Sequence, residues 1–282
     1  MRFFDLHCDT LTKAFDTNQT LLKNKLAVDF EKGLIFENWT QCFAIWINDS
    51  NNNPYEYYKN VLFKYNEYKN KAPENLTTIL TVENASLLEN EITRVEDLKN
   101  DGVKALTLTW NGENCIASGV KAIGGLKPFG YDVICEMNRF KIACDLSHIN
   151  QEGFFEAVKI AEYPFASHSC CMPVKNHPRN LTDKQILKIL DKNGMIGICL
   201  YPLFCGEDVF EGIYKNILHL VDLGAKDHIA IGTDFDGCDM PNKLSDITKM
   251  VNIYKFLQKK NITEQTLEKI FYENANNFFL RL

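Results

Sequence analysis

Histidines and carboxylates stand at the ends of several short apolar runs. His7 and Asp9 close the first run, and Glu83 closes a later one. His148 and His168 close two more. Imidazole and carboxylate groups without paired thiolates form the ligand set of Zn²⁺ and similar divalent ions. Because the chain contains no Cys-x-x-Cys, His-Glu-x-x-His or Gly-x-Ser-x-Gly motif, these residue types predict a metal site built from separate segments.

Two histidine–carboxylate groups around one further carboxylate indicate a site for two ions. Glu83 is the natural bridge, because its segment lies between the segments that carry the other ligands. Two ions about 3.5–4 Å apart would hold a bridging hydroxide, which is a strong nucleophile at neutral pH. Asp234 follows the last apolar run and would lie beside that hydroxide, where it could accept and deliver a proton.

Each of these residues also has a plain structural explanation. A histidine at a strand end is commonly a hydrogen-bonded structural group, and Asp234 and Asp236 beside Gly237 could form a turn. Glu83 could be a carboxylate favoured at the start of a helix. If the apolar runs are the strands of one barrel, all of these ionisable groups meet at the rim formed by the carboxyl ends of the strands. The separate structural explanations do not account for that coincidence.

Eight apolar runs alternate with stretches of helical spacing, which predicts alternating strands and helices. Continuous apolar runs are typical of strands buried on both faces of a parallel sheet. Eight such units in about 240 residues match an α/β fold of the (β/α)₈ TIM-barrel type, with the active site at the carboxyl ends of the strands. An open doubly wound sheet is the alternative, but the first turn lacks the glycine-rich sequence typical of it. The predicted strands are Arg2–His7, Gln41–Ile47, Thr77–Val82, Val103–Thr109, Lys141–Leu146, Phe165–His168, Met195–Tyr201 and His228–Thr233.

The sequence also indicates where helices begin and how the chain is divided. Thr182, followed by Gln185, forms a capping-box pattern ahead of an apolar helical stripe. Ser245 and Thr263 are expected to cap two helices near the carboxyl end. No low-complexity tract, charge run or Pro/Gly-rich linker interrupts the chain, so residues 1–282 are expected to form one domain.

Composition and charge narrow the classes of function. The chain has 31 Lys and Arg against 37 Asp and Glu, a formal net charge of −6, which argues against a nucleic-acid partner. No run of about 18 apolar residues is present, so no membrane span is expected. Asp5 and His7 precede any apolar segment, so no secretory signal is expected either. Ten cysteines, several of them within apolar runs, fit free thiols in a cytoplasmic protein better than a disulfide framework.

These segments, in this order, resemble the membrane (renal) dipeptidase family, the M19 group of metallopeptidases among the amidohydrolase-like barrels. The opening His7-Cys8-Asp9 differs from the His-x-His opening of most amidohydrolase barrels. Many of those barrels bridge their metals with a carboxylated lysine on the fourth strand, whereas here that strand ends in Thr109-Trp110-Asn111. The resemblance extends over nearly the whole chain and rests on Asp5-Leu6-His7-Cys8-Asp9, Thr81-Val82-Glu83, Leu106-Thr107-Leu108-Thr109, Asp145-Leu146-Ser147-His148, Ser167-His168-Ser169, Arg179-Asn180 and Gly232-Thr233-Asp234-Phe235-Asp236-Gly237.

The resemblance implies two zinc ions per chain, bridged by Glu83. His7 and Asp9 would hold one zinc ion. His148 and His168 would hold the other.

The resemblance also assigns roles around the metals. Asp234 would be the acid/base residue, and Arg179 would bind the carboxylate of the substrate. The alternative for Arg179 is a surface residue that caps the helix beginning at Thr182. Trp110 stands where the family carries a histidine that contacts the scissile carbonyl. We expect Trp110 to form a wall that favours apolar or small residues, or only to plug the barrel rim, and Asn111 to be a donor to substrate.

The implied activity is that of a zinc-dependent dipeptidase acting on free dipeptides, with those carrying a D-residue on the C-terminal side among the candidates. The implied protein is cytoplasmic, without nucleic-acid or membrane partners, and a homodimer is one assembly open to it. A second possibility is another binuclear amidohydrolase that acts on a lactone, cyclic amide or phosphoester. A third is a metal-binding barrel without catalysis. Arg179 favours the dipeptidase over the second possibility, because a neutral substrate would not need a positively charged side chain above the metals.

Overall fold

The computed structural model describes residues 1–282, and its eight parallel strands form a closed barrel in the order β1 to β8. All eight predicted strands are present, so the predicted (β/α)₈ barrel is confirmed. The boundaries differ by no more than three residues at either end, most at β2, which begins at Asn38 and not at Gln41. The strands are β1 (Arg2–Cys8), β2 (Asn38–Trp46), β3 (Leu76–Glu83), β4 (Val103–Thr107), β5 (Ala143–Asp145), β6 (Pro164–Ala166), β7 (Met195–Cys199) and β8 (Ile229–Gly232).

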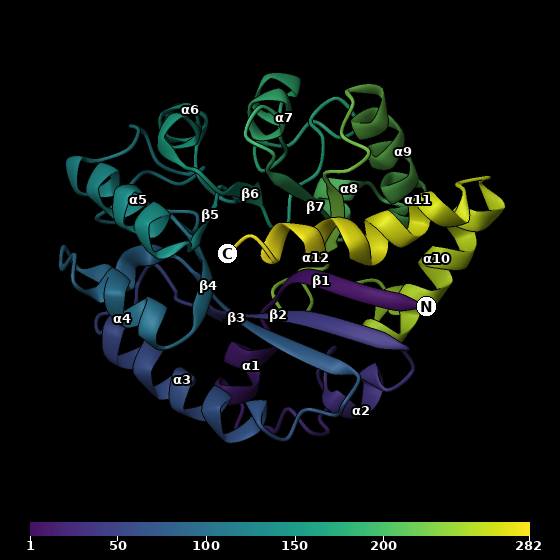
Figure 1. The fold of residues 1–282 in the computed structure, drawn as a ribbon, viewed down its shortest axis with the longest axis horizontal. Coiled ribbons are helices and arrows are strands. Elements are labelled where there is room, and N and C mark those ends of the chain that lie inside the picture. The colour runs from purple at the N-terminus through teal and green to yellow at the C-terminus, as the bar shows by residue number, and fades with distance from the viewer.

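Helices follow the strands and surround the barrel, apart from α12, which lies across it (Figure 1). None of them combines the length and the apolar character that crossing a bilayer requires. A π-helical turn over Lys269–Glu273 joins the last two helices. The helices are α1 (Thr10–Asp16), α2 (Phe30–Gly33), α3 (Pro54–Lys69), α4 (Arg94–Asn100), α5 (Pro128–Phe140), α6 (Gln151–Ile160), α7 (Asp183–Leu190), α8 (Pro202–Cys205), α9 (Val209–Asp222), α10 (Met250–Lys259), α11 (Glu264–Glu268) and α12 (Asn274–Phe279).

Apolar side chains from seven of the eight strands fill the inside of the barrel, and α12 closes its amino-terminal end. The rings of Phe165 in β6 and Phe278 in α12 have centroids 5.4 Å apart. Phe4 in β1 lies at the same distance, 5.4 Å, from Phe279. Since this end is plugged, the carboxyl ends of the strands form the open mouth. The interior cluster consists of Phe4, Leu6, Cys42, Ala105, Ala143, Phe165, Met195, Ala230, Ala275 and Phe278.

An irregularity in β1 brings two successive side chains to the inside of the barrel. The register between β1 and β2 shifts between Asp5 and Cys8. Leu6 packs in the interior cluster, and yet the next residue, His7, also faces the mouth, with its Nε2 3.3 Å from Glu83 Oε2. A regular strand would have turned one of the two outward. The shift therefore lets β1 supply both a core residue and a candidate ligand.

Two of the three predicted helix caps are confirmed. The Thr182 side chain accepts from the backbone N–H of Gln185, and both halves of the capping box are present. Thr263 caps α11 by accepting from the N–H of Thr266. The prediction for Ser245 is wrong, because the neighbouring Asp246 accepts from the N–H of Thr248 and caps a short 3₁₀ turn. Ser245 and Asp246 are adjacent, and both are favourable capping residues, so residue type alone does not show which of them caps the turn.

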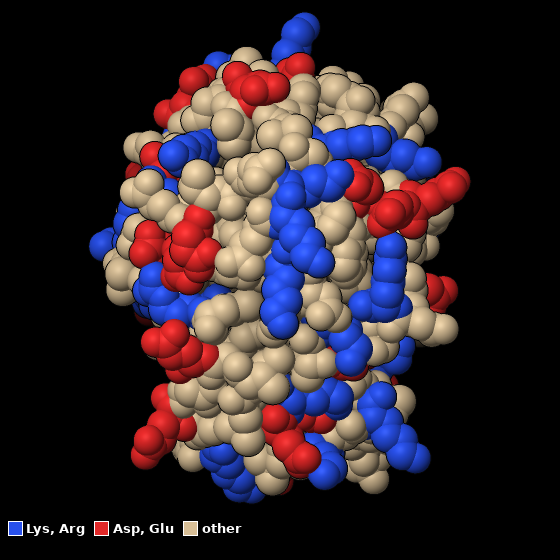
Figure 2. Space-filling view, turned by 90° about the vertical axis from the view of Figure 1, so that its right-hand side faces the viewer, with Lys and Arg blue, Asp and Glu red and all other residues tan.

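Charges of both signs are interspersed over the surface. Figure 2 shows this on the face that α10 and α11 occupy at the right of Figure 1. Lys260, directly after α10, pairs with Glu211 of α9 at 2.7 Å, and Lys269 pairs with Asp227 at 2.5 Å. Exposed pairs of this kind typically contribute only about 0–1 kcal/mol each. The apolar core, rather than these pairs, therefore accounts for most of the stability of the barrel.

Candidate metal centre

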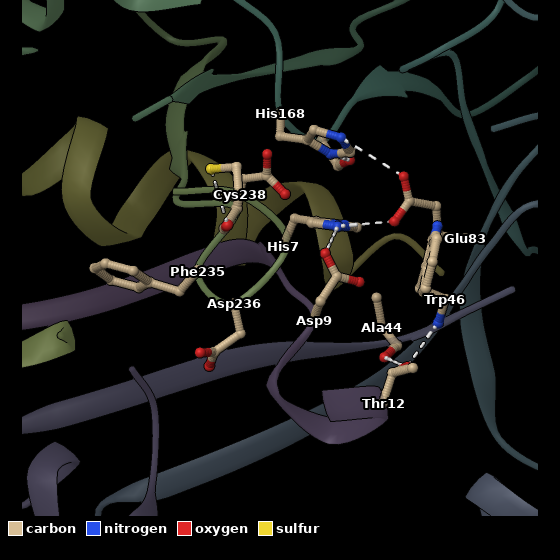
Figure 3. Close-up of polar contacts among 12 residues, drawn as sticks. His7, Asp9, Thr12, Ala44, Trp46, Glu83, His168, Phe235, Asp236 and Cys238 are labelled. Carbon is tan, nitrogen blue, oxygen red and sulfur yellow. Dashed lines mark hydrogen bonds and ion pairs between the residues drawn. The ribbon is translucent and has the colours of Figure 1, made fainter. Parts of the chain in front are cut away.

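Histidine and carboxylate side chains from separate strands meet at the mouth of the barrel. His7 Nε2 lies 3.3 Å from Glu83 Oε2 and 3.5 Å from Asp9 Oδ2 (Figure 3). His148 Nε2 lies 2.8 Å from Glu83 Oε1 and 2.9 Å from His168 Nε2. All five predicted ligands are thus brought together, with Glu83 between the histidines of the two groups.

The donor atoms of this cluster fit divalent cations. Asp9 Oδ1 is buried without a hydrogen-bond partner in the protein, and the contacts of His7 Nε2 with Glu83 and Asp9 lack hydrogen-bond geometry. Buried polar atoms without partners are rare, because they lose their contacts with water and gain nothing in return. A cation would satisfy both. Three sets of donor atoms lie within 4.8 Å of one another: His7, Asp9 and Glu83; Glu83, His148 and His168; and His7, His168 and Asp234.

The charges of the cluster also favour cations. Burial raises the pKa of Glu83 to about 8, and the neighbouring Asp9 carboxylate adds to the effect. Burial disfavours the charged form of His7, but attraction to Glu83 and Asp9 outweighs it and raises the pKa of His7 well above its usual value. Crowded, buried carboxylates repel one another, and a positive charge between them relieves that repulsion. The raised pKa values of Glu83 and His7 thus indicate that added positive charge is favoured at the place where metal ions would lie.

Neighbouring polar groups orient two of the histidines. His148 Nδ1 lies 3.1 Å from Asn111 Oδ1. An amide oxygen only accepts, so Nδ1 carries the proton and the lone pair is on Nε2. His168 Nδ1 lies 2.7 Å from Ser167 Oγ, whose hydroxyl donates to Asp145 Oδ2 at 2.6 Å. The Ser167 oxygen then accepts from His168 Nδ1–H, and both histidines present Nε2 to the cluster, an arrangement common around metal ligands.

Asp234 and Asp236 follow β8 in an unusual backbone conformation, with φ of 61° and 67°. Asp234 is buried and faces the cluster. Asp236 instead accepts from Thr10 Oγ1 at 2.5 Å and from the N–H of Ala27 at 3.1 Å. The turn is therefore real, as the structural explanation proposed. The turn directs the Asp234 carboxylate to the cluster, and it places the Asp236 carboxylate where it hydrogen-bonds to the amino-terminal segment that contains Thr10 and Ala27.

Gly237 lies against the cluster, where a side chain has no room. A Cβ at this position would overlap Asp9 Oδ2 and Asp234 Oδ1. We expect Gly237→Ala to displace a carboxylate and to weaken metal binding by about 10-fold or more, the scale seen for changes next to metal ligands. Chelator titration of the metal-loaded variant measures this, with the thermal unfolding midpoint of the metal-free protein as the control. Unchanged affinity would mean that the loop moves aside to admit the methyl group.

Arg179 follows β6 and is buried, with 5% of its surface exposed. Its Nη2 donates to the His168 carbonyl at 3.2 Å and its Nη1 to Ser169 Oγ at 3.4 Å, while Nε has no partner. Its guanidinium carbon lies 5.3 Å from the centroid of the Phe204 ring. Because Thr182 itself caps α7, the alternative of Arg179 as a surface helix cap is wrong. A buried guanidinium with an unused donor beside His168 is suited to an anionic ligand.

The cluster opens into a cavity of about 560 Å³. Trp110 and Asn111, predicted to contact substrate, both line it. Sequence reasoning missed Trp46 at the end of β2, and Tyr201 and Phe204 after β7. A signal for Trp46 was present, because side chains alternate along a strand and Trp46 lies four residues beyond Cys42, which faces the barrel interior.

The sequence has relatives among dipeptidases. Residues 56–279 match the sequence profile of the membrane dipeptidase family, peptidase family M19. An uncharacterized dipeptidase of Schizosaccharomyces pombe is 31% identical over 185 residues, which cover 62% of this chain and 45% of that protein. An uncharacterized protein from the pqqA 5′ region of Klebsiella pneumoniae is 28% identical over 71% of this chain and 79% of its own length. The chain therefore spans less than half of the yeast protein.

Solved structures share the fold. The crystal structure of dipeptidase AC, a metallopeptidase of family M19, aligns with a TM-score of 0.90 at 22% identity over 100% of this chain and 98% of its own. A metallopeptidase from Rhodobacter sphaeroides, bound to a phosphinate mimic of the dipeptide L-Ala-D-Ala, aligns with a TM-score of 0.89 at 20% identity over 100% and 99% of the two chains. Since the family profile matches most of the sequence, the chain belongs to the membrane dipeptidase family, peptidase family M19.

Proposed function

We propose that this protein is a zinc-dependent dipeptidase that hydrolyses the peptide bond of free dipeptides. The observation that carries the proposal is the buried cluster around Glu83 with the buried guanidinium of Arg179 beside it. The cluster would hold metal ions at the scissile carbonyl of the substrate, and the guanidinium would hold the substrate's carboxylate close to that carbonyl. Membership of the dipeptidase family supports the same reaction.

The proposed centre holds two zinc ions. His7 and Asp9 would bind the first ion, His148 and His168 the second, and Glu83 both. Imidazole and carboxylate ligands suit zinc better than magnesium or calcium, which prefer all-oxygen sites. When bound, such ions polarise a carbonyl oxygen and lower the pKa of water.

The remaining polar residues bind substrate and move protons. Arg179 would orient the substrate through its carboxylate, because a guanidinium can donate two parallel hydrogen bonds to the two oxygens. Asp234 would accept a proton from the attacking water and donate it to the nitrogen of the leaving amine. Asn111 lines the cavity and contacts His148, so it would hold that ligand in place in addition to its predicted role as a donor to substrate.

The substrate class follows from these positions. A carboxylate held beside the metals must lie one residue from the bond that is cut, which favours dipeptides over longer peptides. The structural relative from Rhodobacter sphaeroides is bound to a mimic of L-Ala-D-Ala, which supports including dipeptides with a D-residue on the C-terminal side. We further propose that residues 1–282 form one catalytic domain that acts in the cytoplasm, in keeping with its free cysteines.

The role of Arg179 can be tested on the native enzyme with matched substrates. Amidation of the dipeptide C-terminus should lower kcat/KM by at least about 10-fold, the loss expected when one charge-assisted hydrogen bond is removed. Steady-state kinetics of the zinc-loaded enzyme on L-Ala-L-Ala and its amide measure the ratio. Equal turnover of the acid and the amide would contradict the role. Hydrolysis of a lactone or cyclic amide in preference to any dipeptide would instead favour the other amidohydrolase activity.

A further inference from the structure

Two tryptophans form a continuous aromatic wall in the cavity. The rings of Trp46 and Trp110 have centroids 5.1 Å apart and planes at 76°, an edge-to-face contact. Edge-to-face contacts of this kind are favourable between aromatic rings. Both side chains line the cavity and are half-buried, so part of each indole surface is open to a ligand.

The wall is fixed in place beside the metal cluster. Trp46 pairs with Glu83 in the register between β2 and β3. Thr12 of α1 donates to the Ala44 carbonyl at 3.1 Å and accepts from the N–H of Trp46 at 2.8 Å, which holds the end of β2 (Figure 3). The wall is therefore built into the barrel beside Glu83.

The second tryptophan continues the wall toward the other metal group. The Trp110 ring lies 6.4 Å from the ring of His148, centroid to centroid. The wall thus runs from the strand next to Glu83 to the neighbourhood of His148. A side chain on a substrate whose carbonyl lies at this cluster would be within reach of both indoles.

The closed barrel gives the direction of the substrate. β2 lies four strands away from β6 in the ring of eight, and so on the opposite side of the mouth. Arg179 follows β6, and Trp46 ends β2. A dipeptide with its carboxylate at Arg179 and its peptide carbonyl at the cluster extends toward β2. Its amino-terminal residue then lies against the tryptophans. On the side of Arg179 the cavity is lined instead by Tyr201 and Phe204, whose rings lie 5.0 Å apart.

We propose that Trp46 and Trp110 form the subsite for the side chain of the amino-terminal residue, and that this subsite, with two indoles in place of the one expected from Trp110 alone, selects large apolar or aromatic side chains and not small ones. The inference rests on the proposed dipeptidase activity, because Arg179 sets the orientation of the substrate. An apolar side chain placed against two indole faces is removed from water, whereas glycine leaves the faces exposed. That difference predicts a preference of about 10-fold or more.

The test compares two series of dipeptides on the zinc-loaded enzyme. The first series varies the amino-terminal residue (Phe-Ala, Leu-Ala, Gly-Ala), and the second varies the carboxyl-terminal residue (Ala-Phe, Ala-Leu, Ala-Gly). We expect kcat/KM for Phe-Ala to exceed that for Gly-Ala by about 10-fold or more in the native enzyme. Trp46→Ala and Trp110→Ala should bring that ratio toward one and leave the ratio of Ala-Phe to Ala-Gly nearly unchanged. Trp46→Phe, which keeps an aromatic ring, should retain most of the preference.

A second measurement reports binding without turnover. The chain has three tryptophans, and the third, Trp39, is fully buried and donates to Gln41 Oε1 at 3.3 Å. A phosphinate mimic of Phe-Ala should therefore change the fluorescence of Trp46 and Trp110. The double variant Trp46→Phe, Trp110→Phe should lose that change. Metal analysis and circular dichroism establish that each variant is folded and loaded.

The outcomes separate the two proposals. A native enzyme that hydrolyses dipeptides, with an amino-terminal preference unaltered by Trp46→Ala and Trp110→Ala, would overturn the subsite and leave the dipeptidase proposal standing. A change confined to the carboxyl-terminal series would overturn the inferred direction of the substrate. A folded, zinc-loaded native enzyme inactive on every dipeptide would overturn the dipeptidase proposal and the subsite with it.

Discussion

Replacement of Glu83 by Gln is expected to remove both metal ions and to lower kcat/KM by at least about 10³-fold, since bound metals supply several kcal/mol of transition-state stabilisation. Glu83 Oε2 faces His7 at 3.3 Å, and Oε1 faces His148 at 2.8 Å, so one side chain serves both groups of ligands. An amide cannot offer a negatively charged oxygen to each side. Elemental analysis after dialysis against a dilute chelator should find close to two metals per native chain and almost none in Glu83→Gln.

Single histidine variants give the comparison that identifies a bridge. His7→Asn and His148→Asn each remove a ligand of only one proposed ion, so each should retain more metal than Glu83→Gln. Glu91→Gln, at an exposed position a few residues along the chain, is the control for loss of a carboxylate. Metal content equal to that of the native protein in Glu83→Gln would contradict the proposed bridge.

Stability measurements distinguish loss of metal from loss of fold. Glu83 is buried and lies beside the Asp9 carboxylate. Burial and the Asp9 carboxylate raise the pKa of Glu83 to about 8, so the fold must either hold its charge at a cost or bind a proton, and the neutral amide of Gln carries neither cost. Metal-free Glu83→Gln should therefore unfold at a temperature no lower than that of the metal-free native protein. A much lower midpoint would mean that the variant loses metal because it misfolds.

The meeting of the candidate ligands at one place could be predicted because it depends on strand topology. Each lies at the carboxyl end of a strand or in the residues that follow it, and the carboxyl ends of all strands in a closed parallel barrel meet at one rim. His7, Asp9 and Glu83 need only the strand positions and the alternation of side chains to be placed together. The proposal of Glu83 as a bridge needed no more than the position of β3 between the strands of the other candidate ligands.

The walls of the cavity depend on contacts between distant segments and could not be predicted in the same way. The loop after Trp110 is held by Asp49, which accepts from the N–H of Gly112 at 2.7 Å and from Asn84 Nδ2 at 3.0 Å. These three residues lie far apart in the sequence, and no local pattern connects them. The contact of Asn111 with His148 follows from that loop geometry. The sequence therefore indicated Asn111 as a candidate site residue, but it did not indicate the contact with His148.

Asp234→Asn is expected to lower kcat by about 10²–10⁴-fold, the usual contribution of general acid–base catalysis, while both metals stay bound. Asn has nearly the same shape, but it cannot take a proton from water and return it to the leaving amine. Asp234 could also be a metal ligand, because its carboxylate oxygen lies within 4.8 Å of the donor nitrogens of His7 and His168. The metal content of the variant therefore decides between the two roles. Activity lost in proportion to metal would make Asp234 a ligand and would contradict its role in proton transfer.

Asp236→Asn is the matched control for that prediction. Asp236 lies two residues further along the same turn, with φ of 67° against 61° for Asp234, so both substitutions meet the same kind of backbone. Its carboxylate is bonded to Thr10 and Ala27 instead of facing the cluster. Asp236→Asn should therefore lower the thermal unfolding midpoint with only a small effect on kcat. Asp234→Asn should lower kcat with only a small effect on the unfolding midpoint. Equal losses of activity in the two variants would show that the turn as a whole, and not the Asp234 carboxylate, is what catalysis requires.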